Sequence, residues 1–120
     1  MANILAVDDS VSMRQMVAFT LKSTGHSVTD ACDGKQALEI AKMQTFDLVL
    51  TDVNMPIMDG LSLTKALRLI PEYHFTPILI LTTESSTDKK QEGRAAGATG
   101  WLVKPFNPEQ LLATVKKVLG

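Results

Sequence analysis

Five side chains with acidic, hydroxyl or amino groups stand at the ends of short apolar runs in this sequence. They are Asp8, Asp9, Asp52, Thr82 and Lys104. The three carboxylates and one ammonium group carry a net charge of −2, which one divalent cation would balance. Oxygen ligands without histidine or cysteine suit Mg²⁺, and Mn²⁺ is also compatible with them. A carboxylate beside such a cation can attack phosphorus and form an aspartyl phosphate, while an ammonium group and a hydroxyl stabilise the phosphoryl oxygens.

These side chains need a scaffold that brings the ends of separate segments together, and the hydrophobic periodicity predicts one. The predicted strands are 4–7, 27–31, 48–52, 77–81 and 101–103. The predicted helices between and after them are 11–24, 35–44, 61–70, 85–96 and 108–119. Such alternation favours an α/β fold with a five-stranded parallel sheet covered by helices on both faces. The carboxyl ends of parallel strands share one edge of the sheet, where ligands bind in open folds of this kind.

Local signals support this division of the chain. The run 77–81 is almost continuously apolar, which is typical of a strand buried on both faces, whereas 27–31 alternates weakly and is predicted at an edge. Asn107 and Gln110, with a proline at the first helical position, form the pattern of a capping box before the last helix. The segment 85–96 is polar and interrupted by a glycine, so only a weak helix is expected there.

The composition bounds the class of protein. The 120 residues suffice for one domain, predicted over 1–120, and 45% of them are hydrophobic, as in ordinary globular proteins. A formal net charge of −1 gives no bulk attraction to nucleic acid or membrane. The single Cys32 cannot form an internal disulfide, and no apolar run approaches the ~20 residues of a transmembrane helix. We therefore expect a cytoplasmic protein without a transition-metal cluster.

Each polar residue also has an ordinary structural interpretation when it is taken alone. Asp52 could cap a turn, Asp8 and Asp9 could form a solvated turn, Thr82 could reflect strand propensity, and Lys104 could lie on the surface. Their joint occurrence at the ends of four predicted parallel strands favours a common site over separate coincidences.

Four motifs carry a resemblance to a known family. They are Val7-Asp8-Asp9-Ser10, Asp52-Val53-Asn54-Met55-Pro56-Ile57-Met58-Asp59-Gly60, Leu81-Thr82-Thr83-Glu84 and Gly97-Ala98-Thr99-Gly100-Trp101-Leu102-Val103-Lys104-Pro105-Phe106. With these motifs the whole sequence resembles the receiver domain of two-component response regulators, most closely the single-domain members that act in chemotaxis. The resemblance, rather than the periodicity, implies a doubly wound, flavodoxin-like sheet with strand order 2-1-3-4-5.

Matched position by position, the resemblance implies a role for each acidic residue. Asp52 matches the phosphoacceptor of the family. Asp9 and Asp52 match side-chain ligands of Mg²⁺, with the backbone carbonyl of Asn54 as a third ligand. Asp8 matches an acid that reaches the metal through water.

The resemblance also implies which residues bind the phosphoryl group and respond to it. Lys104 matches the phosphate-binding lysine, and its bond to Pro105 is cis in the family. Thr82 and Trp101 match the switch pair, in which the hydroxyl moves toward the phosphoryl group and the aromatic ring turns inward behind it. Trp101 stands where the family usually has tyrosine or phenylalanine. The movement would bias a two-state equilibrium on the face made by the fourth helix, fifth strand and fifth helix.

The function implied is that of a monomeric, single-domain response regulator, phosphorylated on Asp52 by a histidine kinase (CheA-like). It would act through contact with an output protein such as the flagellar motor switch, without touching nucleic acid or membrane. A phosphorelay intermediate, or a receiver separated from a DNA-binding regulator, are the alternatives within the family. The chain is expected to catalyse only its own phosphorylation and dephosphorylation, and so not to be an enzyme in the usual sense.

Two other classes share parts of the pattern. A Mg²⁺-dependent phosphatase with an aspartyl nucleophile usually carries a second acid two residues later, where this chain has Asn54. A flavodoxin-like cofactor carrier would bind phosphate after the first strand, where Asp8 and Asp9 would repel an anion.

Overall fold

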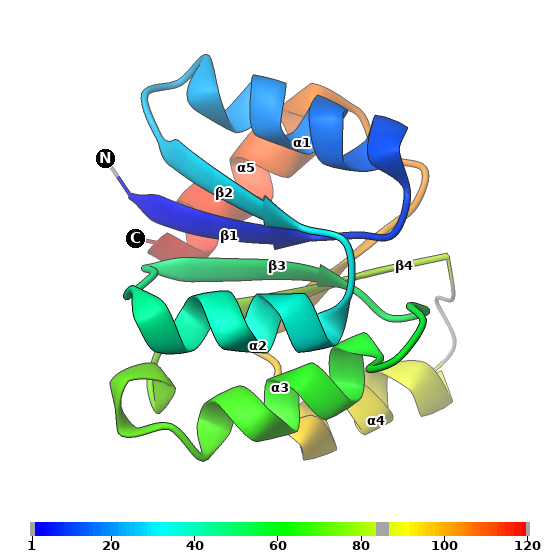
Figure 1. The fold of residues 1–120 in the computed structure, drawn as a ribbon. Helices are drawn as coiled ribbons and strands as arrows, with labels where there is room; N and C mark the ends of the chain where they lie inside the picture. The colour runs from blue at the N-terminus through cyan, green and yellow to red at the C-terminus, as the bar shows by residue number, and fades with distance from the viewer. Residues whose placement is uncertain (1, 84–86, 120) are drawn as a thin grey trace.

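A single parallel sheet organises the chain. The structure, a computed structural model, describes residues 2–83 and 87–119 of the 120. Five strands pair in the order β2-β1-β3-β4-β5 (Figure 1). Their bounds are β1 (Asn3–Val7), β2 (Ser27–Ala31), β3 (Leu48–Asp52), β4 (Ile78–Thr82) and β5 (Gly100–Val103). The doubly wound α/β fold and its strand order confirm the prediction.

Helices cover both faces of this sheet. Their bounds are α1 (Val11–Lys22), α2 (Gly34–Met43), α3 (Gly60–Arg68), α4 (Thr87–Ala96) and α5 (Pro108–Leu119). α1 and α5 lie on one face, where Val17 and Leu111 join an apolar cluster, and α2 and α3 lie on the other, where Ala37 and Leu63 join a second cluster (Figure 1). α4 lies beside α3. None of the helices in the described segments is long and apolar enough to cross a lipid bilayer.

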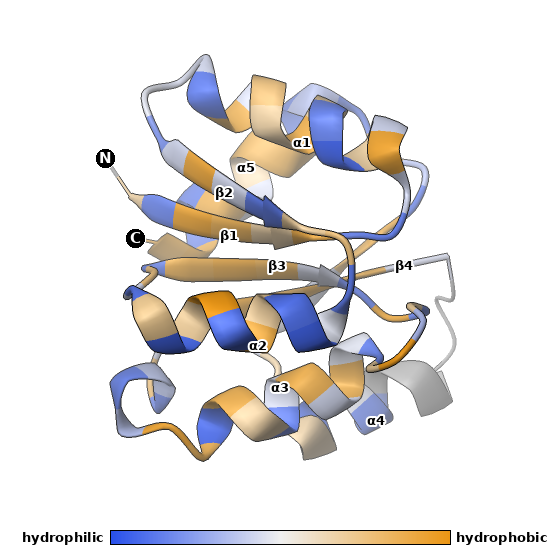
Figure 2. Ribbon diagram, viewed as in Figure 1, coloured by the Kyte–Doolittle hydropathy of each residue, from blue (hydrophilic) through white to orange (hydrophobic). Residues whose placement is uncertain are grey.

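The central strands are apolar along their length, as the hydropathy colouring shows (Figure 2). Every residue of β3 and β4 is buried, because helices cover them on both faces. β2 lies at the edge of the sheet and buries only Ala31, as the weak alternation of 27–31 predicts. The polar groups of β3 and β4 are therefore concentrated where these strands end.

Side-chain caps start the helices directly after the loops that follow the strands. Ser10 accepts from the backbone of α1, Asp33 from that of α2, and Asp59 from that of α3. Asn107 and Gln110 bond reciprocally at 2.9 and 2.8 Å, which confirms the predicted capping box. These caps hold the loops on the carboxyl edge of the sheet in defined conformations.

Two helices end two residues before the predicted positions. α1 ends at Lys22 rather than residue 24, and α3 ends at Arg68 rather than residue 70. A 3-10 helix, η1 (Pro71–Tyr73), follows α3. The Arg68 guanidinium donates hydrogen bonds to the carbonyls of Tyr73 and Thr76 at 2.6 and 2.7 Å. Ile70, the residue before Pro71, is extended, so α3 ends before it. The predicted start of the fourth helix at 85 lies outside the described residues.

Candidate functional site

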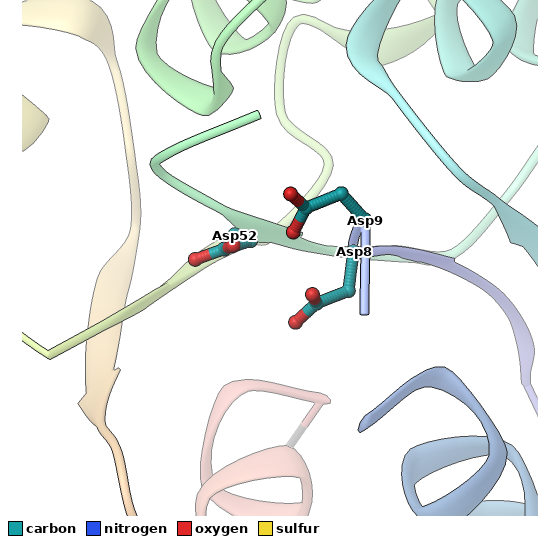
Figure 3. A group of neighbouring side chains, drawn as sticks. All are labelled: Asp8, Asp9 and Asp52. Atoms are coloured by element: carbon teal, nitrogen blue, oxygen red, sulfur yellow. The ribbon is translucent and has the colours of Figure 1, made fainter. Parts of the chain in front are cut away.

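Three carboxylates meet at the carboxyl edge of the sheet. Asp8 and Asp9 follow β1, and Asp52 is the last residue of β3. One carboxylate oxygen from each lies within 4.8 Å of the others (Figure 3). Asp8 is 2% exposed and Asp52 is 8% exposed, whereas Asp9 is open to solvent. The structure thus confirms that these acids, distant in sequence, are brought together.

Pairing of neighbouring strands places Asp8 next to Asp52. β1 and β3 run parallel with Val7 paired with Thr51, so the next residue of each segment, Asp8 and Asp52, reaches the edge at the same level. The backbone N–H of Ser10 donates to the Asp8 carboxylate at 2.9 Å. The Arg14 guanidinium donates to the Asp8 carbonyl at 2.8 Å and to Asp30 of β2 at 3.2 Å. Asp8 is therefore held through both its side chain and its backbone.

Lys104 joins the acidic group from the loop after β5. Its Nζ lies 2.8 Å from Oδ2 of Asp8 and 3.3 Å from Oδ1 of Asp52. The Lys104 backbone N–H also donates to the carbonyl of Thr82 at 2.7 Å, and the bond to Pro105 is cis, as the resemblance implied. The ammonium group bridges two of the three carboxylates.

Burial and charge set the ionisation of the site. Burial raises the pKa of Asp52 above its ordinary value, the positive charge of Lys104 opposes that rise, and the negative charge of Asp8 adds to it. Burial alone would lower the pKa of Lys104, but its hydrogen bond to Asp8 and the charge of Asp52 outweigh that effect and raise the pKa. Lys104 therefore stays protonated between the two carboxylates.

The other predicted site residues lie around this centre. Thr82 is the buried last residue of β4, one strand away from Asp52. Asn54 is exposed in the loop that follows β3. Trp101 lies in β5, half-buried, and packs against the apolar cluster of α2 and α3. Thr82 is thus at the sheet edge with the acids, while Trp101 lies deeper, beside the strand that ends in Thr82.

Two further residues support the site through contacts that the spacing of the sequence does not reveal. Gly60 opens α3 so close to β3 that an added Cβ would lie 2.1 Å from the carbonyl oxygen of Asp52. Arg14 anchors the backbone at Asp8, as described above. Gly60 belongs to one of the motifs that carry the resemblance, but its close approach to Asp52 and the contact of Arg14 with Asp8 depend on separate segments, because a glycine after an aspartate and an arginine in a helix are common in any protein.

The donor set fits a hard divalent cation. Asp8, Asp9 and Asp52 offer carboxylate oxygens at one point, and the group contains neither histidine nor cysteine. Oxygen donors suit Mg²⁺, which keeps several of its own waters and so needs few protein ligands. Such an ion would supply positive charge that polarises phosphoryl oxygens. The residues present are compatible with that chemistry.

A hollow lies at the opposite end of the sheet, away from this site. Its volume is about 730 Å³, and residues that precede β1, β2, β3 and β4 line it together with residues of α5. Ala2, His26, Pro77 and Leu119 are among them. The acidic group at the carboxyl edge is therefore the site to which the chemistry belongs.

The fold and the site together define a doubly wound α/β protein with an acidic, cation-compatible centre at its carboxyl edge. Residues 4–116 match the family model described as the response regulator receiver domain. The chain belongs to this family, the receiver domains of two-component response regulators.

Individual relatives agree with the family assignment. Chemotaxis protein CheY4 of Vibrio cholerae is 58% identical to this chain in sequence. Its solved structure matches with a TM-score of 0.96, and the match covers 98% of both chains. Chemotaxis protein CheY-3 of Vibrio cholerae is 39% identical over 116 residues, 96% of this chain and 89% of that protein. The receiver domain of sensor histidine kinase PA1611 from Pseudomonas aeruginosa is 30% identical to this chain, with a TM-score of 0.91. The match covers 99% of this chain and 98% of that domain, whose structure is described with magnesium in its active site cleft.

Other relatives are much longer than this chain. It spans 13% of a gliding motility regulatory protein of Myxococcus xanthus, to which it is 42% identical over 101 residues. It spans 26% of the transcriptional regulatory protein ZraR of Escherichia coli, to which it is 38% identical over 117 residues. Receiver domains similar to this chain therefore occur within longer proteins that regulate different processes.

Proposed function

We propose that this chain is a phosphorylation-controlled switch in which Asp52 accepts a phosphoryl group from the phosphohistidine of a histidine kinase. The observation that carries the proposal is the convergence of three carboxylates within 4.8 Å, two of which Lys104 bridges at 2.8 and 3.3 Å. An Asp52 oxygen attacks phosphorus and forms a P–O bond. The P–N bond of the phosphohistidine breaks, and its electron pair stays on the imidazole nitrogen.

The neighbouring residues have distinct tasks in this reaction. Lys104 already lies on Oδ1 of Asp52, so its ammonium group binds an oxygen of the transferred phosphoryl group with little displacement. Asp9 and Asp52, with the backbone carbonyl of Asn54, would hold Mg²⁺, while Asp8 reaches the ion through water. Support comes from the oxygen donor set and from the related receiver of PA1611, described with magnesium in its cleft. Hydrolysis reverses the modification: water attacks phosphorus, the P–O bond breaks, and Asp52 and inorganic phosphate are released.

The switch is proposed to run from Thr82 to Trp101. Thr82 ends β4 at the site, and Trp101 pairs across from Ile80 of the same strand. A phosphoryl group on Asp52 would attract the Thr82 hydroxyl, and the Trp101 ring would turn inward behind it. The surface of α4, β5 and α5 would then bind an output protein.

Chemotaxis is the proposed setting. The support is the similarity to CheY4 and CheY-3 of Vibrio cholerae over nearly the full length of all three chains. The corresponding partners are a CheA-like histidine kinase and the flagellar motor switch, both met by a monomer in the cytoplasm. The longer relatives favour a second candidate, a phosphorelay intermediate or the receiver part of a DNA-binding regulator. In either setting the chain is proposed to catalyse only its own phosphorylation and dephosphorylation.

Phosphotransfer tests the proposal. The protein is incubated with a radiolabelled phosphohistidine kinase domain and Mg²⁺, and we expect an acid-stable, base-labile label on the wild type and none on Asp52→Asn. EDTA should prevent labelling. Asp47→Asn, a change at the opposite end of β3, is the matched control and should be labelled normally. Labelling that persists in Asp52→Asn would refute the assignment of the phosphoacceptor.

A further inference from the structure

Arg94 lies over the face of Trp101. Its guanidinium carbon is 5.4 Å from the centroid of the ring, within the distance of a cation–π contact. Arg94 belongs to the last turn of α4 and is exposed, whereas the ring is half-buried in β5. The contact therefore joins the helix and the strand that form the proposed output surface.

We propose that Arg94 is a positioning residue of the switch, which holds the Trp101 ring in its half-buried position and so opposes inward rotation. The inference rests on the proposed function, since it concerns the equilibrium that phosphorylation of Asp52 would bias. It adds a residue of α4 to the pair Thr82 and Trp101 and gives the switch a defined resting contact.

The end of α4 that carries Arg94 is tied to the rest of the domain. The backbone N–H of Gly97 donates to the Arg94 carbonyl at 3.0 Å, and that of Ala98 donates to the Gly93 carbonyl at 2.9 Å. The Arg68 side chain of α3 donates in turn to the Gly97 carbonyl at 2.9 Å. The turn that carries Arg94 is therefore anchored, and in the proposed switch the Trp101 ring is the partner that moves.

The direction of the effect follows from the register of the strands. Trp101 pairs with Ile80 in β4, and Thr82 lies two residues further along, so all three side chains share one face of the sheet. A ring that turns inward toward Thr82, which is buried, moves away from solvent. The exposed guanidinium of Arg94 cannot follow it without losing its hydration. The contact therefore stabilises the half-buried ring relative to the inward one.

Removing the guanidinium should consequently favour the inward ring. Trp101 is the only tryptophan, so its fluorescence reports the equilibrium directly. We measure the concentration of beryllofluoride, a phosphoryl mimic, that gives half of the fluorescence change at saturating Mg²⁺. In Arg94→Gln this midpoint should fall about two- to five-fold, the range expected for a cation–π contact at an exposed site. Quenching of Trp101 by acrylamide without the mimic should decrease as well, which a purely structural role of Arg94 would not produce.

Two variants serve as controls. Arg94→Lys keeps the charge and should have an intermediate midpoint, because an ammonium group interacts with the ring but does not stack on it. Lys42→Gln removes a positive charge from the last turn of α2 and should leave the midpoint unchanged.

The outcomes separate this inference from the proposed function. An unchanged or higher midpoint in Arg94→Gln overturns the role of Arg94. Fluorescence that does not respond to the mimic in the wild type also overturns it, and if Asp52 is still labelled by the kinase domain, the phosphoacceptor assignment stands. Failure of the labelling itself refutes the proposed function instead.

Discussion

Replacement of Lys104 by methionine removes the ammonium group that bridges Asp8 and Asp52 but keeps a side chain of similar length. The side chain of Lys104 is 14% exposed, and those of Asp8 and Asp52 are 3% and 12% exposed. The variant therefore leaves two largely buried carboxylates next to each other without the charge that balances them. We expect it to fold, with a lower free energy of unfolding.

The size of the loss can be estimated from the burial of the pair. Removing one partner of a fully buried ion pair costs about 3–5 kcal/mol. Here the carboxylates lie at the edge of the sheet, where water reaches part of Asp52, so we expect about 2–3 kcal/mol. For a chain of this length, that loss lowers the thermal midpoint by roughly 10 °C.

Urea unfolding in EDTA and in Mg²⁺ measures the effect. Mg²⁺ should restore most of the stability of Lys104→Met and stabilise the wild type less, because the cation replaces the missing charge. Lys65→Met, on the exposed face of α3, is the control and should match the wild type in both buffers. A Lys104→Met variant within about 0.5 kcal/mol of the wild type in EDTA would refute the electrostatic reasoning, since surface substitutions have effects of that size.

Three further changes test the supporting structure. Gly60→Ala places a Cβ 2.1 Å from the Asp52 carbonyl oxygen, so it should cost about 1–3 kcal/mol in urea unfolding and slow phosphotransfer to Asp52. Ile57→Asn should raise the free energy of unfolding by about 1 kcal/mol, because Ile57 has a φ of 70° and is 77% exposed; a loss would contradict this. Tyr73→Phe removes hydrogen bonds of 2.8 and 2.7 Å to two carbonyls and should cost about 1–2 kcal/mol at neutral pH. Burial raises the pKa of Tyr73 above 10.0, so the unfolded phenol ionises first; wild-type stability should fall as the pH rises above that value, and less steeply in Tyr73→Phe.

The meeting of the acids could be predicted because it depends on local patterns and one general rule. Apolar runs of strand length end in Asp8 and in Asp52, and the alternation with helices requires a parallel sheet. In such a sheet all carboxyl ends share an edge, so the side chains after the strands meet whatever the strand order is. Lys104 follows from the same rule. The roles of Asn54 and the order of the strands rested on resemblance instead.

The supporting contacts could not be predicted in this way. Arg14 is one of several charged residues on α1, and only the distance between α1 and β2 makes it a bridge between Asp8 and Asp30. The contact of Arg94 with Trp101 likewise depends on how α4 packs against β5. The Arg68 side chain of α3 also donates to the carbonyls of Tyr73 and Thr76, and no local signal reveals those contacts.

The amino-acid sequence by itself determined the alternation of strands and helices, the capping box of the last helix, and the set of acids and lysine that face one edge. These depend on periodicity and on residue type, both of which are local. Only the tertiary structure decided which carboxylates Lys104 bridges, why Gly60 must lack a side chain, and which cation covers Trp101. Those features depend on distances between elements far apart in the chain, and such distances are set by packing rather than by any single segment.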